Sequence, residues 1–111
     1  MVVVKVDINT LKSDFPKFKK DLLNLNEYMY KNPELGYQEF ESVQKITSLI
    51  TKNVPNAKFN KFKKIPTAFT ASFNQKPHNK NIAICIEYDA LPNVGHACGH
   101  NLISSIGLGA F

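Results

Sequence analysis

The sequence predicts an α/β fold with an incomplete sheet. Two segments with helical spacing of apolar residues come first, and two short alternating segments follow them. Residues 82–88 then form a nearly continuous apolar run, which is typical of a strand covered on both faces. The predicted order is therefore two helices, three strands and the start of a third helix.

The two predicted helices cover residues 10–31 and 38–52. The apolar positions of the first are Leu11, Phe15, Phe18, Leu22, Leu25, Tyr28 and Met29. Those of the second are Phe40, Val43, Ile46, Leu49 and Ile50. Both sets recur at intervals of three and four residues, as one face of an amphipathic helix requires. Pro33 ends the first helix because the residue before a proline is pushed out of the α region.

Three strands are predicted after the helices. Phenylalanine and lysine alternate over residues 59–62, and residues 67–73 form a second β-rich segment. A polar turn that contains Pro77 and His78 leads to the third strand, residues 82–88. A strand this apolar needs cover on two faces, which two helices provide only in part, so the sheet is expected to be incomplete.

Two further expectations concern apolar positions near the C-terminal end of the sequence. Cys85 lies between isoleucines in the third predicted strand and is expected to pack in the core. Residues 102–111 are apolar and contain two glycines, which predicts the first turns of a buried helix.

Composition bounds the class of protein. A chain of 111 residues with 43% apolar content allows one domain with one modest core. The net charge is +5, but all 14 basic residues are lysines. Because nucleic-acid sites rely on the bidentate contacts of arginine, this excess argues against a nucleic-acid partner.

The same numbers predict a cytoplasmic location. The two cysteines do not form a disulfide framework, which suits a reducing compartment. Residues 1–6 are apolar but include Lys5 and are too short for a signal peptide. No run approaches the ~20 apolar residues that span a bilayer, so no membrane partner is expected.

The strongest chemical signal is the connection after residues 82–88. It contains the run Gly95 to Asn101 (Gly-His-Ala-Cys-Gly-His-Asn). Cys98 and His100 are separated by one glycine, and alternate residues of an extended segment point the same way. A thiolate and an imidazole suit zinc, and tolerate cobalt or manganese. The alternative is that Cys98 is a small buried hydrophobe and His100 a polar residue at a helix start.

Other interpretations of this connection remain open. Cys98 would be a nucleophile if His96 or His100 served as its base, although a catalytic base is usually distant in sequence. Asp89 would orient a ligand histidine, act as a ligand itself, or simply form a turn. The acidic residues near the start of the second helix suit the helix dipole; they are Glu34, Glu39 and Glu41.

Three stretches together resemble a known family. They are residues 32–39 (Asn-Pro-Glu-Leu-Gly-Tyr-Gln-Glu), residues 88–92 (Tyr-Asp-Ala-Leu-Pro) and residues 95–101. In this order they are similar to the N-terminal signature of the metal-dependent amidohydrolases, family twenty of the metallopeptidases. Many relatives carry aspartate where this chain has Asn101, and the form with Glu87 and Tyr88 before Asp89 resembles the dipeptidase-like and aminobenzoyl-glutamate-hydrolase-like branch.

The resemblance implies a zinc-exopeptidase-like catalytic domain with two metal ions, interrupted by a small lid and dimerisation domain. It implies that Cys98 and His100 are metal ligands and that Asp89 is the orienting acid. His96 belongs to the motif without being a ligand. The family's Glu-Glu pair, which includes the general base, and two further ligand histidines would lie outside these residues. Residues 1–111 are then expected to be the N-terminal portion of the catalytic domain, without the lid domain and the C-terminal catalytic part.

Two functions follow as expectations. In the first, the complete enzyme uses a metal-activated water to cleave the amide bond of a dipeptide or an N-acyl amino acid, and the isolated chain is inactive. The metal is expected to be zinc, with manganese or cobalt as alternatives, and a homodimer is expected for the full-length relative. In the second, the chain is a non-catalytic remnant or an interaction module that retains the fold.

Overall fold

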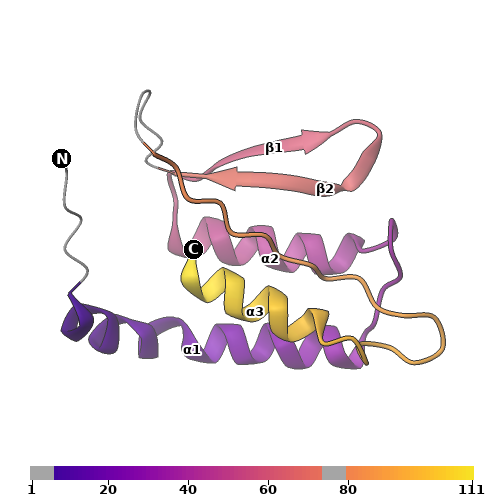
Figure 1. Cartoon of the computed structure of the whole chain (residues 1–111), viewed down its shortest axis with the longest axis horizontal. Coiled ribbons are helices and arrows are strands. Elements are labelled where there is room, and N and C mark those ends of the chain that lie inside the picture. The colour runs from indigo at the N-terminus through magenta and orange to yellow at the C-terminus, as the bar shows by residue number, and fades with distance from the viewer. Residues whose placement is uncertain (1–6, 74–79) are drawn as a thin grey trace.

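The computed structural model of the chain describes residues 7–73 and 80–111. The elements are, in order, α1 (Ile8–Lys31), α2 (Phe40–Asn53), β1 (Lys58–Phe62), β2 (Ile65–Ser72) and α3 (His100–Ala110). Helix α3 packs along α1, and the β-hairpin lies on the side of α2 away from α1 (Figure 1). An α/β arrangement with an incomplete sheet is thus confirmed. The predicted turn at Pro77 and His78 and the apolar residues 1–6 lie outside the described residues.

Both predicted N-terminal helices are confirmed, and their ends have local causes. The side chain of Asp7 caps α1, because it accepts a hydrogen bond of 2.9 Å from the backbone N–H of Asn9. Helix α1 ends at Lys31, just before the Asn32-Pro33 pair. Helix α2 begins at Phe40, two residues later than predicted, and its N-cap residue Glu39 makes no side-chain capping bond.

The cap of α2 comes from outside the helix. The carboxylate of Glu34 accepts hydrogen bonds from the backbone N–H groups of Glu41, at 2.9 Å, and Ser42, at 2.8 Å. It also accepts one from the Ser42 hydroxyl, at 2.6 Å. These are N–H groups that a helix start leaves without intrahelical partners, and a negative charge there is favourable. The expectation that acidic residues suit this helix start therefore holds for Glu34 in a specific way.

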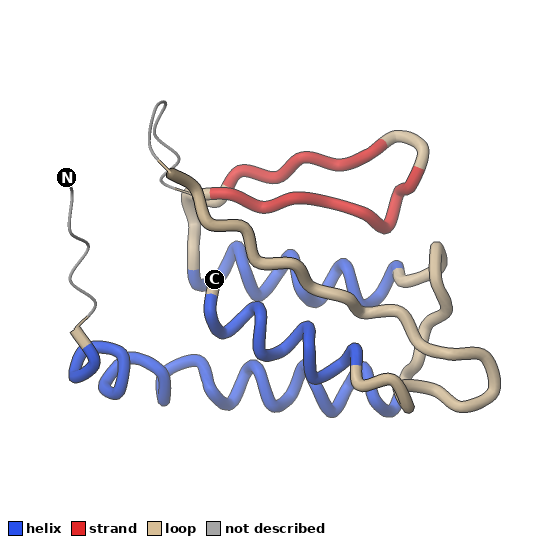
Figure 2. Tube along the Cα trace, in the orientation of Figure 1, coloured by secondary structure: helices blue, strands red, loops and turns tan. Residues whose placement is uncertain are grey.

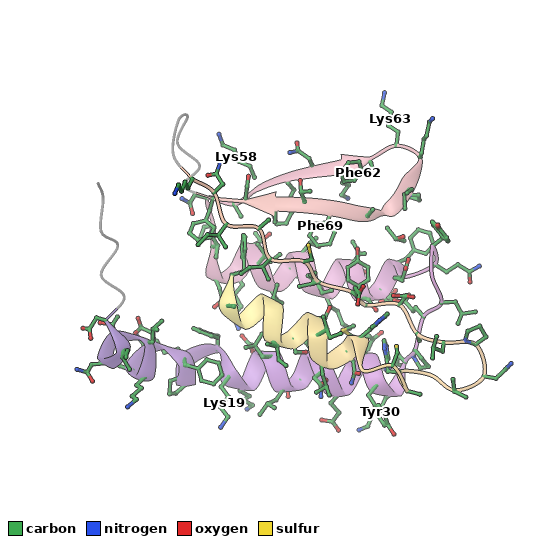
Figure 3. All side chains as sticks on the ribbon, in the orientation of Figure 1. Lys19, Tyr30, Lys58, Phe62, Lys63 and Phe69 are labelled. Atoms are coloured by element: carbon green, nitrogen blue, oxygen red, sulfur yellow. The ribbon has the colours of Figure 1, made fainter. Side chains whose placement is uncertain are left out.

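The sheet within the described residues is one antiparallel hairpin, β1 paired with β2. The register pairs Phe59 with Ala71 and Lys61 with Phe69, and it shifts between Lys61 and Phe62. The predicted strands at 59–62 and 67–73 are confirmed. Phe69 points from β2 toward the helices, whereas Lys58 on β1 points away from them (Figure 3).

One hydrophobic core joins the helices to the hairpin. Its buried centre consists of Leu25 and Met29 from α1 and Ile46 and Ile50 from α2. Partly buried side chains from every other element pack against it; they include Phe59, Phe69, Ile86, Leu108 and Phe111. The apolar positions near the start of α1 extend beyond this core, so Leu11 and Phe15 are exposed.

The prediction of a third strand at residues 82–88 is wrong. Residues 80–89 run as an extended segment between the hairpin and α3, without strand pairing to any described residue (Figure 2). Ile82 is 93% exposed and Ile84 is 41% exposed, and Cys85 is exposed rather than buried. The physical reason is that an extended segment becomes a strand only when a neighbouring strand completes its backbone hydrogen bonds, and no described strand pairs with residues 80–89.

The prediction of a third helix is confirmed, but its buried face differs from the expectation. The buried residues of α3 are small or polar, namely Asn101, Ser104, Ser105 and Gly107. Gly107 is required by close packing, since a Cβ atom there would lie 2.5 Å from a methyl carbon of Ile86. The larger side chains of Leu102, Ile103 and Ile106 are exposed. Helix α3 lies so close to α1 and to residues 84–86 that the face it turns toward them has to consist of small side chains.

Candidate functional site

The motif loop, residues 88–101, is attached by hydrogen bonds to the segment that precedes α2. The backbone N–H of Ala90 donates a 2.7 Å hydrogen bond to the carbonyl of Glu34, and Leu35 pairs with Ala90 as an isolated parallel bridge. The stretches 32–39 and 88–92 are therefore neighbours in space, although about fifty residues of chain separate them. This contact carries the motif loop to the end of α1 and the beginning of α3.

A tight turn shapes the loop before the cysteine. The backbones of Leu91 and Gly95 exchange hydrogen bonds of 2.9 and 3.1 Å. Between them Asn93 has a φ of 65°, and Gly95 itself has a φ of 62°, a left-handed conformation that asparagine and glycine tolerate best. Gly99 repeats this conformation, at 82°, immediately before α3 begins. The two glycines of the motif thus reverse the chain twice within a few residues.

Asp89 and His100 are brought together. Nδ1 of His100 lies 2.8 Å from Oδ1 of Asp89 and 3.0 Å from the backbone carbonyl oxygen of Asp89. His100 is the first residue of α3, so the helix start and the loop both fix its ring. A carboxylate on one ring nitrogen orients the other nitrogen, which is the arrangement seen behind metal-binding histidines.

Glu87 occupies the other side of the same ring. Its Oε2 lies 3.1 Å from Nε2 of His100. Sequence reasoning gave Glu87 no role in the site. The signal was available, because residues 87 and 89 point the same way in an extended segment and so present two carboxylates on one side. Both ring nitrogens of His100 therefore face carboxylates.

Cys98 and His96 line an open cleft beside α1. The cleft has a volume of about 520 Å³, and Asn26, Tyr30 and Asn101 also line it. Cys98 is exposed, whereas His96 is only 6% exposed and neither of its ring nitrogens has a hydrogen-bond partner among the residues that the structure describes. Burial lowers the pKa of His96, His100 lowers it further, and Asp89 opposes them, which favours a neutral ring.

The interpretation of Cys98 as a nucleophile gains no support from these contacts. Within residues 7–73 and 80–111, no hydrogen bond joins Cys98 to His96 or His100. Both nitrogens of His100 are instead directed at Asp89 and Glu87. A thiol without a base in contact lacks the usual activating partner.

Tyr88 and Glu39 form a second polar group next to the motif. The Tyr88 hydroxyl donates a hydrogen bond to the carbonyl of Thr67, and its ring stacks on Phe69 with 6.3 Å between centroids. Burial raises the pKa of Tyr88 to about 12, and the nearby carboxylates Glu39 and Asp89 add to this. Glu39 is 8% exposed, and its Oε2 has no partner among the described residues. Sequence reasoning had assigned Glu39 only to the helix dipole.

The residues present suit a metal ion in chemistry but are not gathered into a complete site. His100 has the oriented imidazole, Cys98 supplies a thiol on the same loop, and the nitrogens of His96 have no partner within residues 7–73 and 80–111. Thiolate and imidazole are typical zinc ligands. In the described part of the chain, however, no group of three histidine, cysteine or acidic side chains is arranged to hold an ion.

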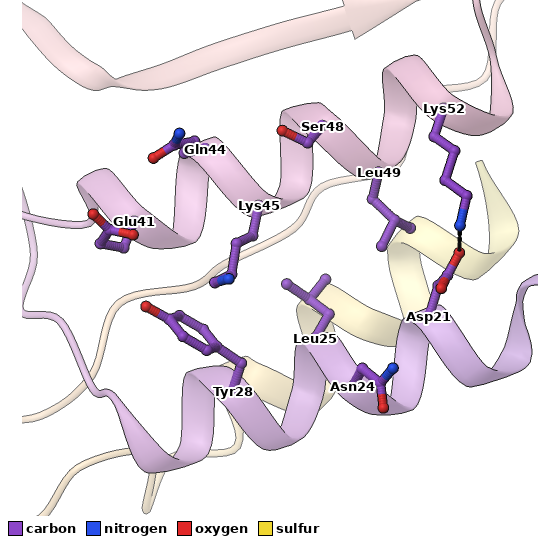
Figure 4. Close-up of a pocket in the computed structure, with 10 residues that line it drawn as sticks. All are labelled: Asp21, Asn24, Leu25, Tyr28, Glu41, Gln44, Lys45, Ser48, Leu49 and Lys52. Carbon is purple, nitrogen blue, oxygen red and sulfur yellow. Dashed lines mark hydrogen bonds and ion pairs between the residues drawn. The ribbon is translucent and has the colours of Figure 1, made fainter.

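A larger groove lies elsewhere, between α1 and α2. It has a volume of about 600 Å³ and contains none of the motif residues (Figure 4). Lys45 lies over the ring of Tyr28, 3.8 Å from its centroid, and Lys52 pairs with Asp21 at 2.5 Å. These are contacts of a solvated surface between two packed helices. The cleft at Cys98 is therefore the better candidate for a functional site, although its volume is smaller.

Comparisons with known proteins agree with the motif. No family model matches the chain. It is 33% identical over 96 residues to the Xaa-Arg dipeptidase of Homo sapiens and 36% identical over 93 residues to that of Mus musculus. Each alignment covers 78% of this chain and 22% of the relative. The N-acetyldiaminopimelate deacetylase of Limosilactobacillus reuteri is 27% identical over 106 residues, which cover 82% of this chain and 28% of the enzyme.

These relatives define the class, which is that of hydrolases acting on C–N amide bonds. Within it, the chain is similar to the metal-dependent amidohydrolases that the motifs resemble. The alignments cover 22 to 28% of the relatives' own length. In addition, no helix among the described residues is long and apolar enough to cross a membrane.

Proposed function

We propose that this chain provides the first metal-binding loop of a hydrolase that cleaves the amide bond of a dipeptide or an N-acyl amino acid. The contact that supports the proposal most directly is that between Asp89 and His100, at 2.8 Å. It holds Nδ1, so Nε2, which faces Glu87 at 3.1 Å in this structure, would be the nitrogen for a metal ion, as in other histidine sites with a carboxylate behind the ring. Cys98 on the same loop would be the second ligand.

The residues of this chain would bind and orient rather than move the proton. His100 and Cys98 would hold the ion, with zinc as the best fit and manganese or cobalt as alternatives. Asp89 would fix the tautomer and direction of the His100 ring. Bound there, the metal would supply a Lewis acid and an activated water.

The remaining catalytic groups are proposed to lie outside these residues. The relatives are several times longer than the aligned region. We propose that residues 1–111 correspond to the N-terminal part of a catalytic domain, and that the general base, the other ligands and a lid and dimerisation domain belong to the rest of such an enzyme. Small-molecule substrates, a cytoplasmic location and a dimeric full-length form belong to the same proposal.

A non-catalytic interaction module is the second candidate. The exposed side chains of Ile82 and Ile84 favour it, because an uncovered apolar segment is a surface for another polypeptide. Metal binding separates the two proposals, since an interaction module has no need of ligands in the motif loop.

Zinc titration calorimetry on the 111-residue chain tests the metal proposal. We expect a micromolar or weaker Kd, because two ligands are fewer than the three or four that hold zinc tightly. Cys98→Ala and His100→Ala should each weaken binding about tenfold or more, whereas Cys85→Ala, which removes an exposed thiol outside the motif, should not. Equal binding by the Cys98→Ala, His100→Ala double variant would contradict the assignment.

Activity provides a second test. The chain alone should not hydrolyse dipeptides or N-acyl amino acids above background, because losing one member of a catalytic constellation costs orders of magnitude. Metal-dependent turnover by the purified chain would show that the general base lies within these residues.

A further inference from the structure

The lysines of this chain are distributed unevenly. Between Glu41 and Glu87 the sequence contains eight lysines and no aspartate or glutamate, whereas the rest of it contains six lysines and all nine acidic residues. Four of these eight lysines belong to the β-hairpin and its turn; they are Lys58, Lys61, Lys63 and Lys64. The positive charge of the chain is therefore concentrated on one part of the fold.

The hairpin presents its lysines to solvent. All four are exposed, and none forms an ion pair with an acidic side chain among the described residues. Lys52 on α2, by contrast, is paired with Asp21. The hairpin is an outer layer of the fold, and Lys58 and Lys63 point away from the helices (Figure 3). In the described part of the chain, no acidic side chain neutralises this basic surface.

Two apolar side chains accompany the lysines at the hairpin tip, residues 61–65. Phe62 is the last residue of β1 and Ile65 the first of β2, and the register places them opposite each other. They are 49% and 39% exposed, and lysines precede and separate them. Apolar side chains among exposed lysines are typical of an element that lies in a membrane interface, where the apolar groups enter and the ammonium groups stay among the headgroups.

The composition and size of the hairpin tip favour a lipid surface over another acidic partner. Lysine is a flexible point charge and lacks the planar fork with which arginine recognises one phosphate or carboxylate in a fixed geometry. Two half-exposed apolar side chains also offer far less than the roughly 800 Å² per partner that a stable protein interface buries. A layer of anionic headgroups requires neither a fixed geometry nor a large contact.

We propose that the hairpin tip binds the surface of an anionic membrane, with Phe62 and Ile65 in the interface and the lysines of the hairpin on the headgroups. The expectation of no membrane partner concerned segments that cross a bilayer, and surface binding requires none. Anionic lipids are concentrated in the cytoplasmic leaflet, which agrees with the proposed cytoplasmic location. The proposal does not depend on the metal site, because the hairpin tip shares no residue with the motif loop.

The expected strength of binding follows from the charges. A lysine near an anionic surface contributes a factor of about five to the partition coefficient. Replacing both lysines of the turn should therefore weaken binding by at least about tenfold. Because exposed charges are screened by salt, binding should also fall steeply as the ionic strength rises.

Sedimentation with vesicles tests the proposal on the 111-residue chain. The vesicles consist of phosphatidylcholine alone or of phosphatidylcholine with phosphatidylserine. The proteins are the unchanged chain, the double variant Lys63→Gln, Lys64→Gln and the matched control Lys19→Gln, Lys20→Gln. The control removes the same two charges from an adjacent, exposed pair on α1, away from the hairpin (Figure 3).

We expect the unchanged chain to bind vesicles with phosphatidylserine at low salt, and to bind pure phosphatidylcholine at least about tenfold more weakly. The variant at Lys63 and Lys64 should lose about tenfold or more in affinity, whereas the control at Lys19 and Lys20 should lose less than about threefold. Circular dichroism should show the same helix content for all three chains, since the replaced side chains are exposed.

Fluorescence locates the contact on the protein. The chain contains no tryptophan, so Phe62→Trp introduces a single reporter at the hairpin tip. Its emission should shift to the blue when anionic vesicles are added, because the ring leaves water. Tyr30→Trp is the control, since Tyr30 is 67% exposed on α1 and lies far from the hairpin (Figure 3). The emission of this control should not shift.

Four results would overturn the proposal. The first is equal binding to both kinds of vesicle, or binding to neither. Equal losses for the two double variants would assign the effect to net charge rather than to the hairpin tip. Unchanged emission of Phe62→Trp in the bound state would exclude insertion of the tip. Binding of polyglutamate or duplex DNA in preference to the vesicles would assign the basic surface to an acidic polypeptide or a nucleic acid.

Discussion

Asn101 at the start of α3 donates a hydrogen bond of 2.9 Å from its side-chain amide to the side-chain oxygen of Asn26 on α1. The two residues are 75 positions apart, and Asn101 is buried. Both line the cleft that contains Cys98 and His96. This amide pair therefore fixes the segment that contains Cys98 and His100 to the first helix of the protein.

Replacing Asn101 with alanine should destabilise the protein by about 1–3 kcal/mol. The change leaves the partly buried amide of Asn26 without its partner, and such losses cost about this much. Urea unfolding followed by circular dichroism measures the difference. Asn24→Ala on the exposed side of α1 is the control and should cost much less. Equal losses for the two variants would show that the amide pair contributes nothing specific.

The protein should lose stability as the pH rises from about 10 toward 12 because of Tyr88. Burial raises the pKa of Tyr88 to about 12 in the folded state, whereas an unfolded tyrosine has a pKa near 10. Between these values the unfolded chain releases the proton first, so this contribution is complete below pH 10 and is lost above it. Urea midpoints measured between pH 9 and 11.5 should fall less steeply for Tyr88→Phe.

Tyr30→Phe serves as the control for this alkaline loss, because Tyr30 is largely exposed and the same group is removed. It should follow the pH dependence of the unchanged chain, which includes the deprotonation of lysines. Identical slopes for the unchanged chain and both variants would contradict the role of Tyr88.

Lysine in place of Ile82 should reduce self-association and leave the unfolding free energy within about 0.5 kcal/mol. Ile82 is 93% exposed in a segment that pairs with no described strand, so its side chain favours association between molecules and does not stabilise the core. Light scattering at increasing concentration measures the association, and urea unfolding measures the stability.

Ile46→Ala provides the contrast, because Ile46 is fully buried and its truncation should cost about 2–5 kcal/mol. A loss of comparable size for Ile82→Lys would show that residue 82 is covered in solution. That result would restore the strand that the sequence predicts for residues 82–88.

Local patterns in the sequence were sufficient for the helices and the hairpin. Periodic apolar positions located α1 and α2, and alternation located β1 and β2, because each of these elements depends on neighbours close in the chain. The third strand failed for the opposite reason. Its apolar composition indicates cover on two faces, but a strand needs a paired neighbour, which composition does not specify.

The candidate site was likewise predictable in part from local pattern. The spacing of Cys98 and His100 and the nearby Asp89 pointed to the loop that is proposed to bind metal, and similarity to dipeptidases and deacetylases agrees with the family resemblance. Their individual roles stay predictions. The partners of these residues were not predictable from spacing alone, and Glu87 and Asn26 were missed for this reason.

By itself, the sequence determined the family resemblance, the helical and hairpin segments and the position of the candidate loop, since these depend on local pattern and on residue types in a fixed order. Only the tertiary structure decided that both nitrogens of His100 face carboxylates and that His96 is buried with no partner in the described part of the chain. It also decided that Glu34 caps α2 while its backbone carbonyl holds Ala90. Contacts between segments far apart in the chain depend on how the elements pack, which local pattern does not encode.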